Sequence, residues 1–475
     1  MYKREDKRED KREDVEEALA TQGRFTGLTA ACIAFAVALL VTSAGPALSQ
    51  GGSSGEFGPD FDSFRREAAV DSISVALNDV YVFPDVAKKM ESLIRKNLEK
   101  GVYDDLSDPI AFADRLTEDL RSVSHDLHLR VLAIRPEDAA PRPDTEEDVR
   151  AWMEEERARL ARRNFGFQKI EILPGNVGYL RFDNFIDATF GGDTAVAAMN
   201  FLANCDAVIV DLRYNGGGSP SMIQLLLSYF LPQPTHINSF YVRQTDETRQ
   251  FWTAAHVDGE RMDETPLYVL TSGGTFSAAE EFTYDVQNLE RGTIVGETTG
   301  GGAHPVDRVR FQYVNLEMSL PFGRAINPIS GTNWEGTGVT PDIAVPAPQA
   351  LDRAHLEALR MLREKTEDPE ALASIDWGLA EIESRLEPVS IGAETMDLYA
   401  GEYGDRRITR EGTTLWYQRG DRPRMAMIPM TRAVFRFEEN PNFRIEVELD
   451  GSGEPVGLIG HYGGGRQDRS RRTAS

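Results

Sequence analysis

The apolar positions of this chain change their period along the sequence, and each change marks a predicted structural unit. In residues 62–133 the apolar residues recur at helical spacing, which predicts a helical domain. Its predicted helices cover residues 70–80, 86–98 and 110–123. The next residues, 134–165, are rich first in proline and then in charge, which predicts a connector.

Residues 166–347 alternate short apolar runs with helical segments, a pattern that is typical of an α/β core. Strands are predicted at residues 167–173, 177–182, 207–210 and 267–270, and helices at residues 221–230 and 277–289. Because the run 207–210 is wholly apolar, we expect that strand to be buried on both faces of a parallel sheet.

Beyond residue 347 the pattern predicts two smaller units. Residues 348–390 form a helical segment, and residues 395–465 contain short alternating runs separated by turn signals. We therefore predict a small antiparallel β domain, with a hairpin turn at Asp450 and Gly451. Trp416 and Tyr417 of this domain are candidates for substrate binding, but packing in the domain core is the favoured interpretation.

Length, charge and composition limit the classes of function that the chain can have. A chain of 475 residues is too long for one core and predicts several domains. Its formal charge of −25 argues against nucleic-acid binding, because phosphate contacts need basic patches. The sequence has neither a phosphate-binding glycine loop nor histidine and cysteine residues at zinc spacing, so we expect no metal and no other cofactor.

The N-terminal residues 1–49 are interpreted as a signal sequence with a charged tail. Residues 2–14 repeat Lys-Arg-Glu-Asp, and an uncharged segment with an apolar centre at 28–41 follows. Cleavage before Gln50 predicts an exported protein, periplasmic or extracellular. The alternative is an uncleaved anchor helix, and membrane contact is expected only in that case. Cys205 would be the only cysteine of the mature chain, which leaves no intramolecular disulfide.

Ser277 is the candidate nucleophile. It follows the strand 267–270 and the glycine pair at 273–274, and it precedes a predicted helix. A serine at a helix N-terminus lies beside unpaired backbone N–H groups that favour a developing anion. The alternative is an ordinary N-cap, because Ser277 and Glu280 also fit a capping box.

Two further features are open to a catalytic or a structural interpretation. Three glycines, 216–218, follow Asn215 at a predicted strand end, where exposed backbone N–H groups can bind an oxyanion. The same glycines could instead form a tight turn that needs positive φ. His128 follows a predicted helix and is either a general base or a residue that stabilises the helix C-terminus.

Several motifs taken together resemble the tail-specific serine peptidase family. They are His128, Asn215 with its three glycines, residues 275–282, residues 296–302 and residues 335–342, in that order. The likeness covers about residues 66–347. It is strongest to the branch that contains the tricorn core protease and the modules of interphotoreceptor retinoid-binding protein.

This resemblance implies a crotonase-like or Clp-protease-like α/β core that hydrolyses peptide bonds. By motif, Ser277 would be the nucleophile, His128 the general base, and Glu335 the residue that acts on the histidine. The oxyanion donors would be the backbone N–H of Ala278 and that of Gly217 or Gly218. Such an arrangement is chemically coherent, because a hydroxyl needs a base to take its proton and a third group to orient that base.

The chain departs from the family in three ways. Many members use a lysine base, but no lysine lies between Ser277 and Phe322, so the serine–lysine dyad is absent and the base must be a histidine or nothing. Leu127 stands where the tricorn branch has a serine, and the connector is too short for a peptide-binding PDZ domain. His304 is a competing base, although its position after three glycines favours a mobile loop near the cleft.

We therefore predict an exported serine peptidase that forms an acyl-enzyme on extended peptides or unfolded protein. One alternative is a carrier of apolar ligands on the same fold, and another is an esterase, because the same acyl chemistry serves both bonds. A homo-oligomer is compatible with the sequence.

Overall fold

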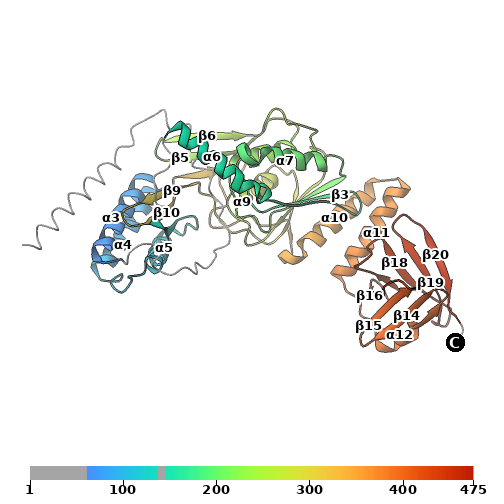
Figure 1. Cartoon of the computed structure of the whole chain (residues 1–475). Helices are drawn as coiled ribbons and strands as arrows, with labels where there is room; N and C mark the ends of the chain where they lie inside the picture. The colour runs from blue at the N-terminus through green and yellow to red at the C-terminus, as the bar shows by residue number, and fades with distance from the viewer. Residues whose placement is uncertain (1–60, 137–144, 474–475) are drawn as a thin grey trace, which may run out of the picture.

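The computed structural model describes residues 61–136 and 145–473 (Figure 1). Helices α3 to α5 lie at one end of the molecule, the central α/β part follows, and a C-terminal sheet lies at the other end. The predicted signal sequence, residues 1–49, lies outside the described residues. Within the described residues, none of the helices combines the length and the apolar character needed to span a bilayer.

The N-terminal part is helical, as its spacing predicts. Its helices are α3 (Ser63–Val80), α4 (Pro84–Glu99) and α5 (Pro109–Ser124). The Asp62 and Asp108 side chains accept hydrogen bonds from backbone N–H groups of the first turns of α3 and α5, which satisfies donors that the helices leave free. α5 ends at His125, whose φ of 56° turns the chain out of the helix.

The helical part shares its core with strands from distant regions of the sequence. β1 (Arg130–Ala133), β10 (Leu316–Pro321) and β9 (Val306–Phe311) form an antiparallel sheet in that order. Buried residues of α3 to α5 and of these strands belong to one hydrophobic cluster. This pairing fixes the turn between α5 and β1, which carries His128, against the central part of the chain.

The central sheet of the described chain has six strands and is parallel except for one edge strand. In spatial order they are β12 (Ile343–Ala344), β8 (Thr293–Gly296), β7 (Leu267–Thr271), β4 (Ala207–Asp211), β3 (Val177–Phe182) and the antiparallel β2 (Phe167–Leu173). Every residue of β4 is buried, so the prediction of a two-sided buried strand is confirmed.

Helices cover both faces of this sheet, which gives an α/β three-layer architecture (Figure 1). One face carries α7 (Ala188–Leu202), α8 (Pro220–Ser228) and α9 (Ala278–Asn288), and the other carries α10 (Ala350–Lys365) and α11 (Pro369–Leu386). Alternate β4 side chains divide between the layers: Val208 and Val210 pack under the first set, and Ala207 and Ile209 under the second. Cys205 is a free, buried cysteine beneath α7.

The loops that leave the carboxyl ends of β4, β7 and β8 meet at one edge of the sheet. In open parallel sheets this edge is where ligands bind. A smaller antiparallel sheet lies beside it, formed by β11 (Gly323–Ile326), β5 (His236–Val242) and β6 (Glu247–Trp252). The candidate nucleophile and the glycine turn therefore reach the same place from different strands.

The C-terminal part is an antiparallel sheet of the order β13 to β20, as its alternation predicts. Its strands are β13 (Gly401–Tyr403), β14 (Arg406–Glu411), β15 (Thr414–Arg419), β16 (Met425–Pro429), β17 (Val434–Arg436), β18 (Phe443–Leu449), β19 (Pro455–Tyr462) and β20 (Gln467–Arg471). The remaining helical elements are α6 (Glu146–Ala161), η4 (Asn164–Gly166), η5 (Ala347–Gln349) and α12 (Ala393–Tyr399).

The two aromatic residues that the sequence singles out in this sheet differ in burial. Tyr417 is buried in the core of the sheet, as the favoured interpretation predicts. Trp416 is half-buried, and the guanidinium carbon of Arg424 lies 4.2 Å from the centre of its ring. The sheet packs on α11 through Arg444, which donates to the backbone carbonyl of Trp377 at 2.5 Å.

Candidate active site

Ser277 stands at the start of α9 in a strained backbone conformation. It is the N-cap residue, with φ of 56° and ψ of −122°, whereas an ordinary N-cap residue is extended. A non-glycine residue at positive φ costs free energy and is held only where surrounding contacts enforce it. One such contact joins the preceding residue to the glycine turn, because the Phe276 N–H donates to the Asn215 carbonyl at 3.1 Å.

The glycine turn after β4 lies directly against Ser277. A Cβ atom on Gly217 would lie 2.7 Å from the Ser277 Cβ and 3.0 Å from the Ala278 nitrogen, so only a glycine fits this position. The predicted nucleophile and its predicted oxyanion donors are therefore neighbours. The Gly217 N–H, however, donates to the Asn215 side-chain oxygen at 2.9 Å.

Two other amides at this point have no acceptor in the described part of the chain. Within the described residues, the backbone N–H groups of Gly218 and Ala278 donate no hydrogen bond. Gly218 has φ of 146°, and a Cβ there would lie 2.1 Å from the Phe185 carbonyl oxygen. Unpaired N–H groups beside a serine hydroxyl are the chemistry that an oxyanion requires.

Glu280 ties the loop after β8 to the nucleophile. Its buried carboxylate accepts hydrogen bonds from the Ser277 N–H at 2.8 Å, the Thr299 hydroxyl at 2.6 Å, and the N–H groups of Gly301 and Gly302 at 2.6 and 2.9 Å. Burial raises the pKa of Glu280, and these donors act in the opposite direction. The Ser277–Glu280 pattern is thus part of a larger network that spans two loops.

His128 lies in the turn between α5 and β1, next to the residue before Ser277. The centre of its ring is 4.6 Å from that of Phe276, and its backbone N–H donates to Asp126 Oδ1 at 3.0 Å. The side chain is half-buried, but its Nδ1 is fully buried and has no hydrogen-bond partner among the described residues. Burial lowers the pKa of His128 to about 4, so the ring is neutral at pH 7.

His304 is buried and fixed, which corrects the expectation that it lies on a mobile loop. Its Nδ1 lies 2.7 Å from Asp126 Oδ2, and its ring contacts that of Phe83 at a centre-to-centre distance of 5.5 Å. Burial alone would lower the pKa of His304, but the hydrogen bond and charge of Asp126 outweigh burial and raise it. The glycines before His304 suggested mobility, whereas its partner lies on a distant segment that holds the ring.

Glu335 lies beside His304. Its Oε2 accepts the Ala303 N–H at 2.6 Å and is 3.6 Å from His304 Nδ1. Burial raises the pKa of Glu335 to about 7, with Asp126 adding to the rise. Within the described residues Glu335 forms no hydrogen bond or ion pair with His128, so the structure brings the predicted third residue to the competing histidine.

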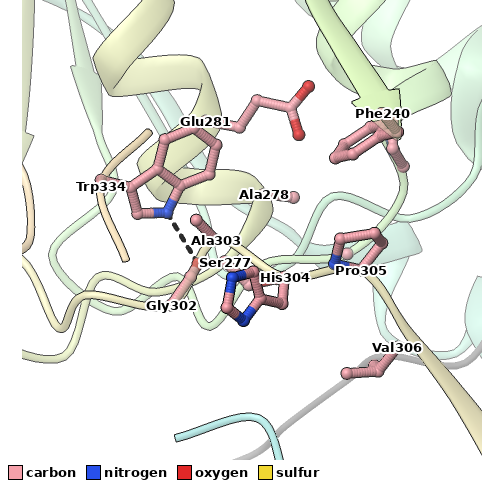
Figure 2. A pocket seen from close by; sticks show the side chains of 12 residues that line it. Phe240, Ser277, Ala278, Glu281, Gly302, Ala303, His304, Pro305, Val306 and Trp334 are labelled. Atoms are coloured by element: carbon pink, nitrogen blue, oxygen red, sulfur yellow. Dashed lines mark hydrogen bonds between the residues drawn. The ribbon is translucent and has the colours of Figure 1, made fainter. Parts of the chain in front are cut away.

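A pocket opens at this edge of the sheet, and Ser277 forms part of its wall. Ala278, Glu281 and His304 also line it, with Phe240 and Trp334 on its sides (Figure 2). The Trp334 indole donates to the Gly302 carbonyl at 2.7 Å, which fixes this side of the pocket. His128 is not among the lining residues.

Sequence reasoning missed two carboxylates of this site. Asp126 stands two residues before His128, and this spacing was the available signal for it. Glu281 follows Glu280, and the capping-box pattern drew attention to the first acid alone.

In the described part of the chain, one cluster of histidine and acidic side chains could hold a metal ion. It consists of Asp126, His304 and Glu335, whose ligand atoms lie within 4.8 Å of one another.

Comparison with known proteins shows which family models the chain resembles. Residues 176–345 match the model of peptidase family S41, and residues 63–174 match the N-terminal domain of Peptidase_S41 in eukaryotic IRBP. A solved structure of a photosystem II D1 C-terminal processing protease is 15% identical, with a TM-score of 0.38 over 59% of this chain and 93% of that chain.

Two relatives carry names that agree with the motif resemblance. A carboxy-terminal-processing protease of Bartonella bacilliformis is 31% identical over 37% of this chain and 40% of its own length. The tricorn protease of Thermoplasma volcanium is 24% identical over 38% of this chain and 15% of its own length. The chain thus spans less than half the length of either relative. The two family models together match almost all of residues 63–345, so the resemblance to the tail-specific serine peptidases that the motifs predicted is confirmed.

Proposed function

We propose that this chain is an exported serine peptidase in which Ser277 attacks the carbonyl carbon of a peptide bond. One observation carries the proposal. Ser277 is held in a strained conformation at the start of α9, beside the Gly218 and Ala278 amides that have no acceptor within the described residues. Such a position suits a serine hydroxyl that forms an ester with the substrate. It also suits a substrate carbonyl oxygen that becomes an anion, because the two amides can donate to it.

The reaction would proceed through an acyl-enzyme. A base takes the Ser277 Oγ proton as Oγ bonds to the carbonyl carbon, and the carbonyl oxygen becomes an oxyanion that the two amides stabilise. The C–N bond then breaks, and the base returns the proton to the leaving amine. Water attacks the ester by the same route and releases the acid. Because Gly217 already donates to Asn215, its proposed role is to leave room beside Ser277.

The proposed general base is His128, the histidine of the family motif. Three observations support it: its ring contacts the residue before Ser277, its Nδ1 is buried and unpaired in the described structure, and it is neutral at pH 7. A base must be unprotonated before it can accept the serine proton. Glu335, proposed to act on the base, would then have to reach His128 when substrate binds.

His304 is the second candidate, because it lines the pocket with Ser277 and Asp126 holds its Nδ1. A carboxylate at one ring nitrogen and a nucleophile at the other is the arrangement of a catalytic triad. In that case Asp126 would orient the base, and His128 would pack behind the nucleophile.

The pH dependence of kcat/KM on an uncharged peptide separates the two assignments. If His128 is the base, kcat/KM stays flat from about pH 6 to 8, because the ring is already neutral there. If His304 is the base, kcat/KM rises with pH through an inflection above the ordinary histidine value of 6.5. His128→Gln and His304→Gln complete the test: the base variant should lose about 10³-fold or more, and the exposed His125→Ala is the control.

A fluorophosphonate probe tests the nucleophile directly. The adduct should appear on Ser277 and should be absent from Ser277→Ala, with peptide cleavage lost in the same variant. A folded chain that takes no adduct would contradict the proposal and would direct the next experiment to binding of an apolar ligand. Cleavage of ester but not peptide substrates would assign the chain to the esterases.

The remaining parts of the proposal concern export and substrate. We expect extended peptides or unfolded protein as substrates of a crotonase-like or Clp-protease-like core. N-terminal sequencing of the purified protein should begin near Gln50, in the periplasm or medium. A retained Met1 would instead mean that the apolar segment anchors the chain to the membrane.

A further inference from the structure

Glu281 is a buried acid on the wall of the pocket, one helical turn beyond Ser277. The residue is only 3% exposed, and its Oε1 has no hydrogen-bond partner among the described residues. In Figure 2 the carboxylate projects from α9 toward the space between Trp334 and Phe240. Residues four apart on a helix lie on the same side, so Glu281 and Ser277 face one ligand.

The neighbours of Glu281 do not neutralise it. Asp285, the next acid on the same face of α9, is also buried and has an unpartnered oxygen, Oδ2. Asn238 of β5 is neutral, and its Nδ2 makes no hydrogen bond of ordinary geometry in the described chain. Within that chain no arginine or lysine pairs with Glu281, and His304, across the pocket, already pairs with Asp126.

A buried carboxylate without a partner destabilises the fold, and a cation that enters the pocket and pairs with the carboxylate removes this destabilisation. The flanking rings favour one shape of cation. Phe240 and Trp334 offer apolar faces for the methylene stem of a long side chain, and aromatic faces also attract a cationic head. Lysine and arginine combine such a stem with such a head.

We propose that Glu281 selects peptides with lysine or arginine at the residue whose carbonyl Ser277 attacks. The proposal rests on the peptidase function proposed above and adds its substrate class. Glu281 lies on the same wall as Ser277 and the Ala278 amide, so the side chain that reaches it belongs to the residue that carries the reacting carbonyl. The ion pair would form at the free carboxylate oxygen.

Matched peptides that differ at this one residue test the proposal. Lysine, arginine, glutamine and norleucine are compared, norleucine being a neutral side chain of similar length. The kcat/KM ratio of lysine to norleucine should favour lysine in the wild type and fall about 10- to 100-fold in Glu281→Gln, which keeps the size and removes the charge. Glu156→Gln is the matched control, because Glu156 is a buried glutamate outside the pocket lining whose carboxylate pairs with Arg159.

The pH dependence of the same ratio gives a second readout that needs no variant. Burial raises the pKa of Glu281 to about 7, with Asn238 acting in the opposite direction. The lysine preference should therefore decline as pH falls below about 7, because the protonated acid no longer attracts the cation. The titratable groups that face Glu281 are Asp285 on α9 and His304 across the pocket, and comparison with norleucine cancels effects that both substrates share.

Each outcome decides the proposal. A wild-type ratio near one, a preference for glutamine over lysine, or an equal loss in Glu156→Gln would overturn it. If Glu281→Gln does not fold, the wild-type pH profile decides alone. Probe labelling of Ser277 keeps the two proposals apart: a labelled enzyme without basic preference refutes only the role of Glu281, whereas an unlabelled, inactive chain refutes the peptidase itself.

Discussion

Glu280 and Glu281 are neighbours in the first turn of α9, yet their carboxylates have opposite surroundings. Glu280 accepts four hydrogen bonds from two loops, whereas Glu281 has a fully buried oxygen with no partner among the described residues. Both side chains are buried, so burial does not distinguish them. What distinguishes them is whether the protein itself completes their hydrogen bonding.

The same contrast holds for the two histidines. His304 is held by Asp126, whereas the buried Nδ1 of His128 forms no hydrogen bond with any described residue. Side chains whose hydrogen bonds are all made within the protein fix the geometry of this edge of the sheet. Side chains that lack a hydrogen-bond partner can instead bind a proton or a substrate. Stability and reactivity should therefore respond to different substitutions at this one edge of the sheet.

The largest effect on stability is expected for Glu280→Ala. The substitution removes the shared acceptor of Ser277, Thr299, Gly301 and Gly302, and leaves buried donors unpaired. We expect a loss of about 4 kcal/mol in the free energy of unfolding, together with loss of probe labelling at Ser277. Urea denaturation measures the first. An unchanged midpoint would show that the loops do not depend on Glu280, and Glu281→Gln provides the comparison because it removes no such acceptor.

Gly218→Ala should lower both stability and activity. Its φ of 146° is unfavourable for any side chain, and the new Cβ would lie 2.1 Å from the Phe185 carbonyl oxygen. The backbone must shift, at a cost of roughly 2 kcal/mol in stability, and the shift moves the proposed oxyanion donor. Peptide cleavage should fall at least about tenfold. Gly273→Ala is the control, since a Cβ there meets nothing within 4 Å, and equal losses in both variants would remove the special role of Gly218.

The pH dependence of stability tests whether Glu281 is buried as an acid without a partner. The pKa of Glu281 rises from 4.5 in the unfolded chain to about 7 in the fold, mainly through burial. Between these values the folded chain binds more protons than the unfolded chain, so the free energy of unfolding falls as pH rises, by up to about 3 kcal/mol. The penalty is absent below the unfolded value and complete above about pH 7.

Glu281→Gln removes this contribution, so its stability should decline less steeply between about pH 5 and pH 8 than that of the wild type. Urea denaturation at the two pH values measures the difference, which should be largest at the higher one. Parallel curves for the two proteins would mean that Glu281 has an ordinary pKa in the fold.

The sequence predicted those features that depend on local pattern. Strands β2 and β3 have the predicted limits, and the α9 helix begins where the hydroxyl and the capping acid indicated. Helix α7 was not anticipated, because the pair Gly191–Gly192 lies in its first turns and weakens the helical signal. Strands β5 and β6 were not anticipated either.

Features set by long-range contacts could not be predicted in this way. The hydrogen bond that buries His304 comes from Asp126, which is 178 residues away in the chain. The free oxygen of Glu281 likewise depends on which side chains from β5 and the loop of Trp334 surround it. Motif spacing identified Ser277, but only the packed fold shows which histidine and which acids share its pocket.

The smallest effect is expected at Trp416, which carries an unpaired group far from the pocket. Its indole Nε1 is buried without a partner among the described residues, and Arg424 covers its ring. In Trp416→Phe the loss of apolar area is offset by removal of the unpaired N–H, so the free energy of unfolding should change by less than about 1 kcal/mol. Tyr417→Ala, in the core of the same sheet, should cost about 3 kcal/mol. Because no described contact joins Trp416 to the pocket, kcat/KM should be unchanged in Trp416→Phe. A fall in kcat/KM with the fold intact would mean that the C-terminal sheet takes part in substrate binding. It would also mean that the unpaired group of this sheet, like those of the pocket, binds a ligand.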